Sequence, residues 1–236
     1  MKKAFTMAEV LITIGIIGLV ASMTLPSLYN HINSKGYVER LKKAHSLLQN
    51  ATNLIISDYG QPEDWIPDGY KIGNEQGADA AISAAQGVVN LYAKQFNTVY
   101  ICEFSGASSK ESNCNLNRDE YKGLNGQPVG AGNGSLPPYY YVYPIVLSDG
   151  SSIAFRFQRN QSGGYFWGTP LLTFIVDVNG LQRPNTVGRD IFYLYLNEQG
   201  SVLPYGDGNF GEDDCNTNGK GESCAYKVLT EDRMNY

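Results

Sequence analysis

The residue whose chemistry is hardest to explain by packing alone is Glu9, an acid in the otherwise apolar stretch Phe5–Leu28. As a helix with a rise of about 1.5 Å per residue, this stretch is about 36 Å long, enough to cross a bilayer core of about 30 Å. A carboxylate inside a transmembrane helix costs on the order of 2.5–3.5 kcal/mol, so an acid at such a position usually has a function. The structural alternative is an acid near the helix end whose side chain extends to the membrane surface.

Two ordinary interpretations account for only part of this segment. A cleaved secretory signal requires small residues at a cut site after the apolar run. Ala21-Ser22-Met23 approximates such a site poorly, and the apolar character continues beyond it. A simple membrane anchor explains the length but not the acid. The basic residues between positions 35 and 43 outnumber Lys2 and Lys3, so a count of basic residues alone does not favour a cytoplasmic N-terminus.

A third interpretation comes from a resemblance. The string KKA-FTMAEVLITIGIIGLVASMTLP, from Lys2 to Pro26, resembles the N-terminal signature of type IV pilin-like proteins, which comprise the pilins and the pseudopilins of type II secretion. In that family a short basic leader is cut ahead of a Phe, an acid lies four residues after that Phe, and a Pro closes the apolar run. The resemblance covers only the N-terminal part of the chain.

The resemblance implies a role for each matching residue. The leader is residues 1–4, cut between Ala4 and Phe5, and Phe5 becomes the N-methylated first residue. Glu9 is the assembly acid, which pairs with the N-terminal amine of Phe5 in a neighbouring subunit. Pro26 matches the proline that kinks the family's helix. Ala4 stands where the family prefers Gly.

The hydrophobic pattern predicts one long helix from Phe5 to about Asp58, with a membrane half and an amphipathic half, ended by Tyr59–Pro62. Beyond Pro26 the apolar residues recur at three- and four-residue steps or their multiples, which is the spacing of one helix face. We expect Gly18 and Pro26 to let the middle of the helix bend or melt, because proline removes a backbone donor and clashes with the preceding turn. The expected stripe is Leu28, Ile32, Val38, Leu41, Leu48, Ala51 and Ile55, widened by Leu47 and Leu54.

The segment after this helix is less regular. Ala78–Phe96 has apolar residues at helical steps and predicts a helix, and Val99–Ile101 predicts a short strand. Gly123–Gly134 is rich in glycine and predicts a loop. A phosphate site would need such a loop to lead into a helix N-terminus, whereas Leu136-Pro137-Pro138 follows here.

From Tyr139 onward the sequence predicts antiparallel strands. Asp149-Gly150 between two β-rich runs is a hairpin signal. The apolar face of the sheet needs a cover, which the amphipathic half of the first helix can supply. We therefore predict an α+β fold in which a long N-terminal helix packs on a four- to five-stranded antiparallel sheet, as the pilin resemblance also implies. The expected strands are Tyr139–Leu147, Ser152–Gln158, Leu171–Val178, Ile191–Asn197 and Val202–Pro204.

Four cysteines in loop-like sequence allow three pairings. Local pairing is the simplest, and each short bridge would contribute roughly 2–3 kcal/mol in the chain-entropy picture. Metal binding needs closer pairs, such as C-x-x-C, and an exported compartment favours disulfides. The expected bridges are Cys102–Cys114 and Cys215–Cys224.

Two acid-rich stretches offer oxygen ligands for calcium, although neither has the spacing of an EF-hand. The alternative is turn chemistry, in which Asp and Asn bond their own backbone. We predict no cofactor and no metal site, and calcium stays an open alternative. The first stretch contains Asp207, Asn209, Glu212, Asp213 and Asp214, and the second contains Asp177, Asn179 and Asp190.

The remaining composition argues against catalysis and general nucleic-acid binding. The two histidines, His31 and His45, lie on the predicted stem helix, and no nucleophile, zinc or P-loop motif is found. The net charge of −5 argues against general nucleic-acid binding, because such binding needs clustered Lys and Arg to displace counterions. Dense aromatics, Tyr139–Tyr143 and Tyr165–Trp167, suit a sugar-binding or adhesive surface or a subunit contact, but strand propensity explains most of them.

These observations lead to one main expectation and one alternative. We expect a structural subunit of a type IV pilus or type II secretion pseudopilus, with leader 1–4, transmembrane and assembly helix 5–28, and exported head 29–236. The resemblance implies a cytoplasmic N-terminus in the inner membrane, a prepilin peptidase and methylase, an inner-membrane assembly platform, and self-assembly into a helical filament. The alternative is a membrane-tethered, non-assembling binding module, and an enzyme is not expected.

Overall fold

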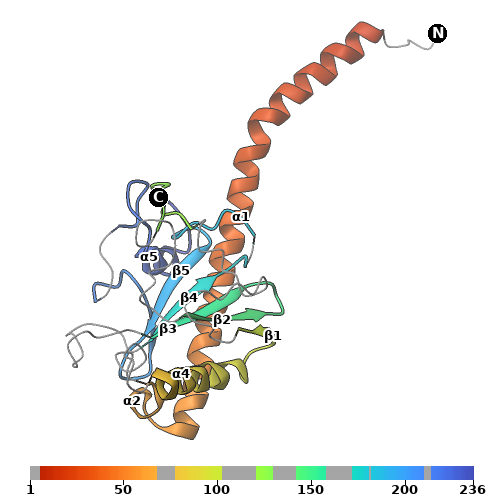
Figure 1. Ribbon diagram of the computed structural model, residues 1–236. Coiled ribbons are helices and arrows are strands. Elements are labelled where there is room, and N and C mark those ends of the chain that lie inside the picture. Colours follow the sequence, from red (N-terminus) through yellow and green to blue (C-terminus); the bar gives the residue numbers. More distant parts are fainter. Residues whose placement is uncertain are drawn as a thin grey trace. The chain divides into compact units, whose positions relative to one another are not determined.

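The computed structural model describes residues 6–67, 78–102, 121–129, 142–157, 172–180, 182–209 and 214–236. It is an α+β protein in which a long N-terminal helix precedes a six-stranded antiparallel sheet (Figure 1). The chain divides into two compact units, residues 1–36 and 37–236, and each is described by itself below.

The first helix, α1, extends without a break from Met7 to Tyr59. Its predicted end is confirmed: Gly60 adopts a φ of +89°, which ends the helix, and its N–H donates to Ile56 O at 3.0 Å. A left-handed glycine after the last turn is a common way to end a helix. A short helix that the sequence did not predict, α2 (Pro62–Trp65), follows, and Asp64 accepts a hydrogen bond from the Gln61 N–H at 3.0 Å.

The sheet has six strands rather than the predicted four or five. The chain-order neighbours are also the spatial neighbours throughout, so the sheet is an antiparallel meander. The additional strand is the short one predicted near residue 100, which pairs with the next strand through Ile101 opposite Ile145. The strands are β1 (Thr98–Ile101), β2 (Val142–Leu147), β3 (Ser152–Phe157), β4 (Leu172–Asp177), β5 (Ile191–Leu196) and β6 (Val202–Pro204).

The predicted Asp-Gly hairpin between β2 and β3 is confirmed. Gly150 has a φ of +84°, a conformation that glycine adopts without a steric penalty. Leu147 donates its N–H to Ser151 O at 2.9 Å, and the Asp149 carboxylate accepts the N–H and the hydroxyl of Ser151 at 3.0 and 2.6 Å. The turn therefore fixes the register in which Ile145 lies opposite Ile153.

One face of the sheet packs against α1 and α4 (Ala78–Ala93), as Figure 1 shows. Alternate strand residues, such as Phe155 and Phe174, meet Tyr92 of α4 with ring centroids 5.1 and 5.4 Å apart. The buried Tyr92 hydroxyl lies 2.8 Å from Thr52 Oγ1 of α1, so its polar atom is satisfied inside the core. The predicted cover of the sheet by the amphipathic half of the helix is thus present.

The buried stripe of α1 differs from the predicted one, because it begins later and includes Ala44 and Thr52, which were not predicted. It consists of Val38, Leu41, Ala44, Leu48, Ala51, Thr52 and Ile55. Leu47 packs against its margin, as expected, but Leu54 is 53% exposed, because its side of the helix is not the side that meets the sheet and α4. Leu28 and Ile32 belong to the first unit and are exposed there, so the stripe begins ten residues later than Leu28, at Val38.

Polar side chains of α1 also bond the sheet. Gln49 accepts the Val202 N–H at 2.8 Å and donates to Gly200 O at 3.0 Å, and His45 Nε2 lies 2.8 Å from Val202 O. These contacts satisfy the outer backbone groups of β6, an edge strand whose free N–H and C=O groups would otherwise invite pairing.

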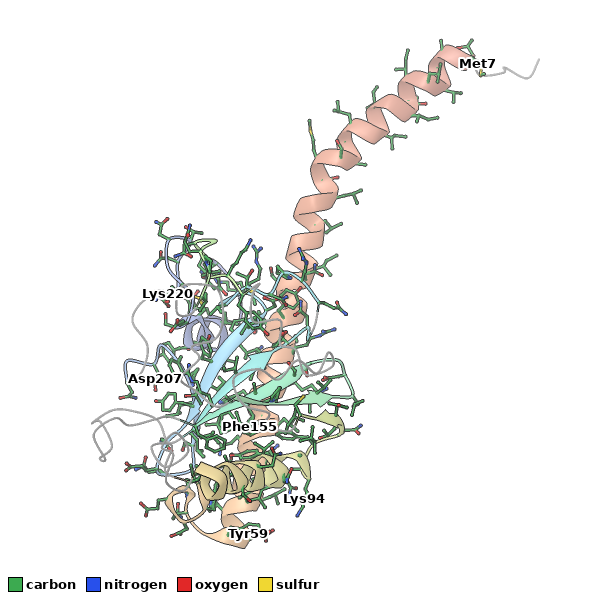
Figure 2. All side chains as sticks on the ribbon, viewed as in Figure 1. Met7, Tyr59, Lys94, Phe155, Asp207 and Lys220 are labelled. Atoms are coloured by element: carbon green, nitrogen blue, oxygen red, sulfur yellow. A yellow bond between two sulfur atoms is a disulfide. The ribbon has the colours of Figure 1, made fainter. Side chains whose placement is uncertain are left out.

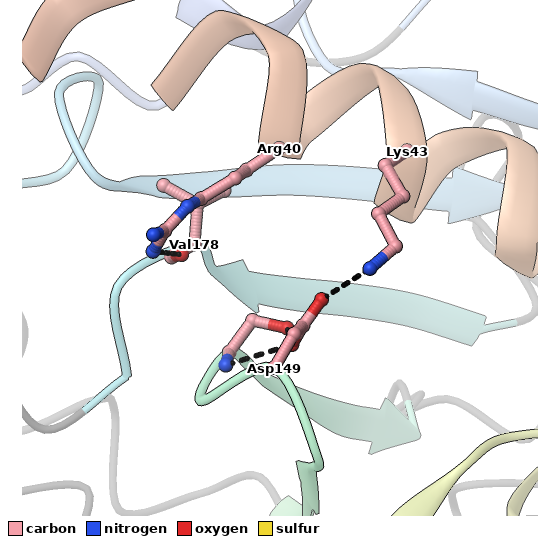
Figure 3. Close-up of polar contacts among 5 residues, drawn as sticks. Arg40, Lys43, Asp149 and Val178 are labelled. Atoms are coloured by element: carbon pink, nitrogen blue, oxygen red, sulfur yellow. Dashed lines mark hydrogen bonds and ion pairs between the residues drawn. The ribbon is translucent and has the colours of Figure 1, made fainter. Parts of the chain in front are cut away.

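A second pair of contacts joins α1 to two sheet loops (Figure 3). Arg40 donates to Val178 O, just beyond β4, at 3.0 Å. Lys43 pairs with Asp149 in the β2–β3 turn at 2.6 Å. The part of α1 beyond residue 37, which we call the stem, is therefore attached to the margin of the sheet by polar contacts as well as to its apolar face.

The opposite face of the sheet carries a smaller core that contains more tyrosine. Tyr193 and Tyr205 have ring centroids 5.8 Å apart, and Arg156 lies 5.5 Å from the centre of the Tyr193 ring. The C-terminal helix α5 (Cys224–Glu231), which the sequence did not predict, belongs to the main core through Ala225 and Val228.

The difference between the buried and exposed leucines of α1 can be tested. Leu48 is fully buried and Leu54 is 53% exposed. We expect Leu48→Ala to lower the free energy of unfolding by about 2–5 kcal/mol, because it leaves a cavity in the core. The control Leu54→Ala should change it by less than about 0.5 kcal/mol. Urea unfolding of the detergent-solubilised chain measures both, and equal effects would contradict the described packing.

The Lys43–Asp149 ion pair predicts a pH effect. Partial burial raises the pKa of Asp149, but hydrogen bonds from Lys43 and Ser151 outweigh it and lower the pKa to about 2. Because the unfolded carboxyl titrates near pH 3.9, the stabilisation is present above that pH and is lost as the pH falls towards 2. The pair is partly exposed, so we expect Asp149→Asn to cost about 0.5–1 kcal/mol at pH 7. In Lys43→Gln the same substitution should cost little, which a double-mutant cycle measures.

Candidate functional site

The N-terminal part of α1 presents an apolar surface that the described structure does not cover. The 19 residues Met7–Leu25 are apolar enough to span a membrane, and none of this window is buried. Figure 2 shows side chains extending outward around the helix from Met7 onward. At about 1.5 Å per residue this window is about 28 Å long, close to the hydrocarbon thickness of a bilayer. Such a surface needs an apolar environment, either lipid or other helices.

The hydroxyl groups on this helix are bonded within the helix itself. Thr13 donates to Val10 O at 2.9 Å, and Ser22 donates to Leu19 O at 2.7 Å. Thr24 donates to Val20 O at 3.0 Å. A polar group in a bilayer without a partner costs several kcal/mol, so these internal bonds suit the segment to an apolar medium.

Glu9 takes part in a reciprocal bond at the first turn of α1. Its carboxylate Oε2 accepts the Thr6 N–H at 2.8 Å and the Thr6 hydroxyl at 2.9 Å. In return, the Glu9 N–H donates to Thr6 Oγ1 at 3.3 Å. This is a capping box, in which Thr6 is the N-cap and each of the two side chains accepts one backbone N–H that lacks a helical partner.

The capping box is readable in the sequence, although it was not among the predicted features. Thr6-Met7-Ala8-Glu9 is the pattern of Ser or Thr followed three residues later by Glu, directly before an apolar run. The box gives Glu9 a local structural role. The capping box does not require the negative charge of Glu9, because a neutral glutamine can fill the same position in such a box.

The other residues named for this segment fare differently. Ala4 and Phe5, the expected cleavage and methylation site, lie outside the described residues. The backbone of α1 stays helical through Gly18 and Pro26, so their expected flexibility stays a prediction. A Cβ placed on Gly18 or on Gly15 would meet no atom within 4 Å, so neither glycine is required by packing inside the described chain.

The predicted disulfide between Cys215 and Cys224 is present and closes the loop that leads into α5. Cys102 is also disulfide-bonded, whereas Cys114 lies outside the described residues. Cys215 and Cys224 are both buried, which places their bond in the main core rather than on the surface.

The first acid-rich stretch shows turn chemistry. Asp207 accepts the Asn209 N–H at 3.0 Å and the Tyr195 hydroxyl at 2.5 Å. The Asp214 carboxylate accepts the N–H of Glu222 at 3.1 Å and both the N–H and hydroxyl of Ser223 at 2.9 and 2.7 Å. Glu212 and Asp213 lie outside the described residues, as do the clusters Tyr139–Tyr141 and Tyr165–Trp167. Within the described ranges, no three acidic, His or Cys side chains gather where they could hold a metal ion.

The second stretch brings its three polar residues together in the loop between β4 and β5. Asp177 accepts the Asn179 N–H at 3.2 Å. Asp190 accepts the N–H groups of Asn185 at 2.9 Å and Thr186 at 2.6 Å. These are again the bonds of turns and loop closure, and both acids are buried.

Neither the histidines nor the aromatics form a recognisable catalytic site in the part of the chain that is described. His45 bonds the backbone of β6, which is a packing role, and nothing is described of the His31 side chain. Buried tyrosines, which our sequence analysis did not single out, gather instead on the sheet face around Tyr193, Tyr195 and Tyr205. Their alternation along β5 with leucines was the available signal.

Comparison of the chain with protein-family models, with curated proteins and with solved structures found no match.

The bonds of Asp207 and Asp214 lead to a prediction about metal removal. Because backbone and side-chain donors already occupy these carboxylates, we expect a chelator to leave the thermal midpoint of the solubilised chain unchanged at pH 7. Melting curves with EDTA, with EDTA followed by excess calcium chloride, and without either would be compared. A midpoint that falls with EDTA and recovers with calcium would show that one of the acid-rich stretches binds the ion.

Proposed function

We propose that this chain is a type IV pilin-like subunit, a structural protein that assembles into a filament through its apolar N-terminal helix. The observation that carries the proposal is the combination at the start of the chain: a basic leader, Glu9 four residues after Phe5, and an apolar run closed by Pro26. Two structural features support it: the apolar window Met7–Leu25 is uncovered, and residues 37–236 form an α+β unit that contains a disulfide.

The physical logic of assembly follows from the exposed surface of α1. Met7–Leu25 is stable in lipid before assembly, and a bundle of identical helices can replace that lipid with packed side chains. The head would lie outside the inner membrane, with the N-terminus in the cytoplasm. A prepilin peptidase and methylase and an assembly platform are the implied partners, and the product is a pilus or a periplasmic pseudopilus.

In this proposal Glu9 has two functions that can be separated. As part of the capping box it accepts the Thr6 N–H and hydroxyl within its own chain. As an anion it would attract the free amine of Phe5 in a neighbouring subunit, and in a low dielectric an uncompensated charge is costly. The first function needs only an acceptor atom, whereas the second needs the negative charge.

The alternative function is a membrane-tethered binding module that does not assemble. The capping box favours this alternative specifically, because it explains Glu9 by helix initiation alone, without a second subunit. A tether also needs the apolar window of α1 but neither leader cleavage nor a charged residue at position 9.

Three variants separate the two functions of Glu9. Glu9→Gln keeps an acceptor for the capping box but removes the charge, and Thr6→Ala weakens the box but keeps the charge. We expect Glu9→Gln and Glu9→Ala to stay in the membrane and to reduce fibre formation at least tenfold, while Thr6→Ala retains more assembly than either. Sheared fibres are quantified by immunoblot and electron microscopy, with membrane content as the control.

The outcomes distinguish a filament subunit from a tethered module. Normal fibres from Glu9→Gln would remove the charge from the assembly mechanism and leave only the cap. The absence of fibres from the wild-type chain in its own cells, together with a mature N-terminus at Met1, would favour the tethered module. Mass spectrometry of the native protein identifies its mature N-terminal residue, which the proposal expects to be N-methylated Phe5.

A further inference from the structure

Two aspartates at the ends of β4 and β5 are buried without a cation. Asp177 is 3% exposed and Asp190 is fully buried. None of the ion pairs in the described ranges includes either carboxylate. Two carboxylates in one low-dielectric site rarely both ionise, because each charge loses its hydration and repels the other.

The hydrogen bonds distinguish the two acids. Both oxygens of Asp190 accept backbone N–H groups, Oδ2 from Asn185 at 2.9 Å and Oδ1 from Thr186 at 2.6 Å. An acceptor-only carboxylate suits these donors. For Asp177, burial is the main cause that raises its pKa well above the ordinary value, and the charge of Asp190 adds to it. Burial raises the pKa of Asp190 as well, but hydrogen bonds from Thr186, Asn185 and Asn179 oppose this effect. Asp177, whose pKa is raised well above the ordinary value, is therefore the member of the pair that we assign the proton to.

A third observation in the same loop concerns Asn179. Its side chain is buried, and its Nδ2 donates to the Tyr37 hydroxyl at 3.3 Å and to Arg183 O at 3.2 Å. Its Oδ1 is also buried but has no hydrogen-bond partner in the described structure. A buried acceptor without a donor is unfavourable. A neutral carboxyl group on Asp177 adds an O–H donor to the same loop as Asn179 Oδ1, the acceptor that lacks a donor.

The loop that contains these residues connects α1 to the sheet. Arg40 donates to Val178 O at 3.0 Å (Figure 3), and Asn179 Nδ2 donates to Tyr37. Both contacts join the stem, at residues 37–40, to the segment directly after β4. We propose that Asp177 keeps its proton at neutral pH, and that release of this proton loosens the β4–β5 loop from α1, so that the loop is a proton-dependent latch.

The other charged and titratable groups around this loop do not supply the same effect. Asp149 is already paired with Lys43 and ionises near pH 2. Burial raises the pKa of Tyr236, which donates to Gly188 O, so it stays neutral. The groups on the surrounding elements are Tyr37, Arg40 and Lys43 of α1, Asp149 of the β2–β3 turn, Arg183 and Arg189 of the loop, and Tyr236.

The sign of the pH effect follows from the raised pKa of Asp177. The folded chain holds a proton that the unfolded chain releases near pH 3.9, so stability falls as the pH rises from there to the folded pKa. For each pH unit in which the folded state holds one proton more, the thermal midpoint should fall by about 3–5 °C in a domain of this size. This sign is opposite to that of the Lys43–Asp149 pair.

The test uses the full chain in detergent micelles between pH 5 and pH 9. Hydrogen exchange, corrected for the intrinsic rate at each pH, should show the amides of Val178, Asn185 and Thr186 losing protection at high pH while those of β3 keep theirs. Asp177→Asn, which cannot ionise, should keep the loop protected at high pH and make the thermal midpoint less dependent on pH. Asp149→Asn is the matched control and should retain the wild-type loss at the loop.

Three results would contradict the proposal that the proton on Asp177 holds the β4–β5 loop to α1. The first is wild-type protection of the loop that does not change with pH, a result that does not depend on any variant folding. The second is an Asp177→Asn chain with the same pH dependence as the wild type. The third is removal of that dependence by calcium chloride, because both carboxyls would then be ionised and bound to a cation. None of these results bears on filament assembly, which is measured separately.

Discussion

The burial of one face of α1 against the sheet, between Val38 and Ile55, is the contact on which the unit of residues 37–236 depends. An antiparallel sheet with two apolar faces needs a cover on each, and α1 with α4 supplies one of them. Tyr92 lies at the centre of this contact, with aromatic neighbours from β3 and β4 and a hydroxyl bonded to Thr52. The stem of the helix is therefore part of the folded domain and not a separate appendage to it.

Local signals in the sequence predicted most of this architecture because they act over a few residues. The Asp149-Gly150 turn required a left-handed position and obtained it, and Gly60 ended α1 where the pattern stopped. The order of the strands agrees with the tendency of consecutive strands to be neighbours in a sheet. Periodicity also placed α4 correctly, although Phe96 lies just beyond its last helical residue, Ala93.

The errors concern information that periodicity does not contain. Leu54 is apolar and close to the stripe, but only the position of the sheet and α4 decides that it faces solvent. The strand near residue 100 was predicted by itself, and its membership of the sheet depends on a partner more than forty residues away. The helix α5 is short and begins at a disulfide-bonded cysteine, Cys224, so its apolar residues gave little signal. Likewise, the sequence grouped Asp177 with Asn179 and Asp190 as possible calcium ligands but could not show that both carboxylates are buried.

The two ends of α1 lie in different surroundings, and these surroundings determine which polar groups of the helix need a partner. A helix satisfies its own backbone groups everywhere except at its ends, so the same α1 backbone suits lipid at one end and a protein core at the other. At the first turn the N–H groups need acceptors, and Thr6 and Glu9 provide them locally. Hydrogen bonding alone therefore accounts for an oxygen acceptor at position 9, and a neutral side chain would satisfy it. What hydrogen bonding leaves unexplained is why position 9 holds a carboxylate rather than an amide. The positive end of the helix dipole favours a negative charge in the first turn. No ion pair in the described part of the chain includes Glu9, so a neighbouring cation would add to that stabilisation.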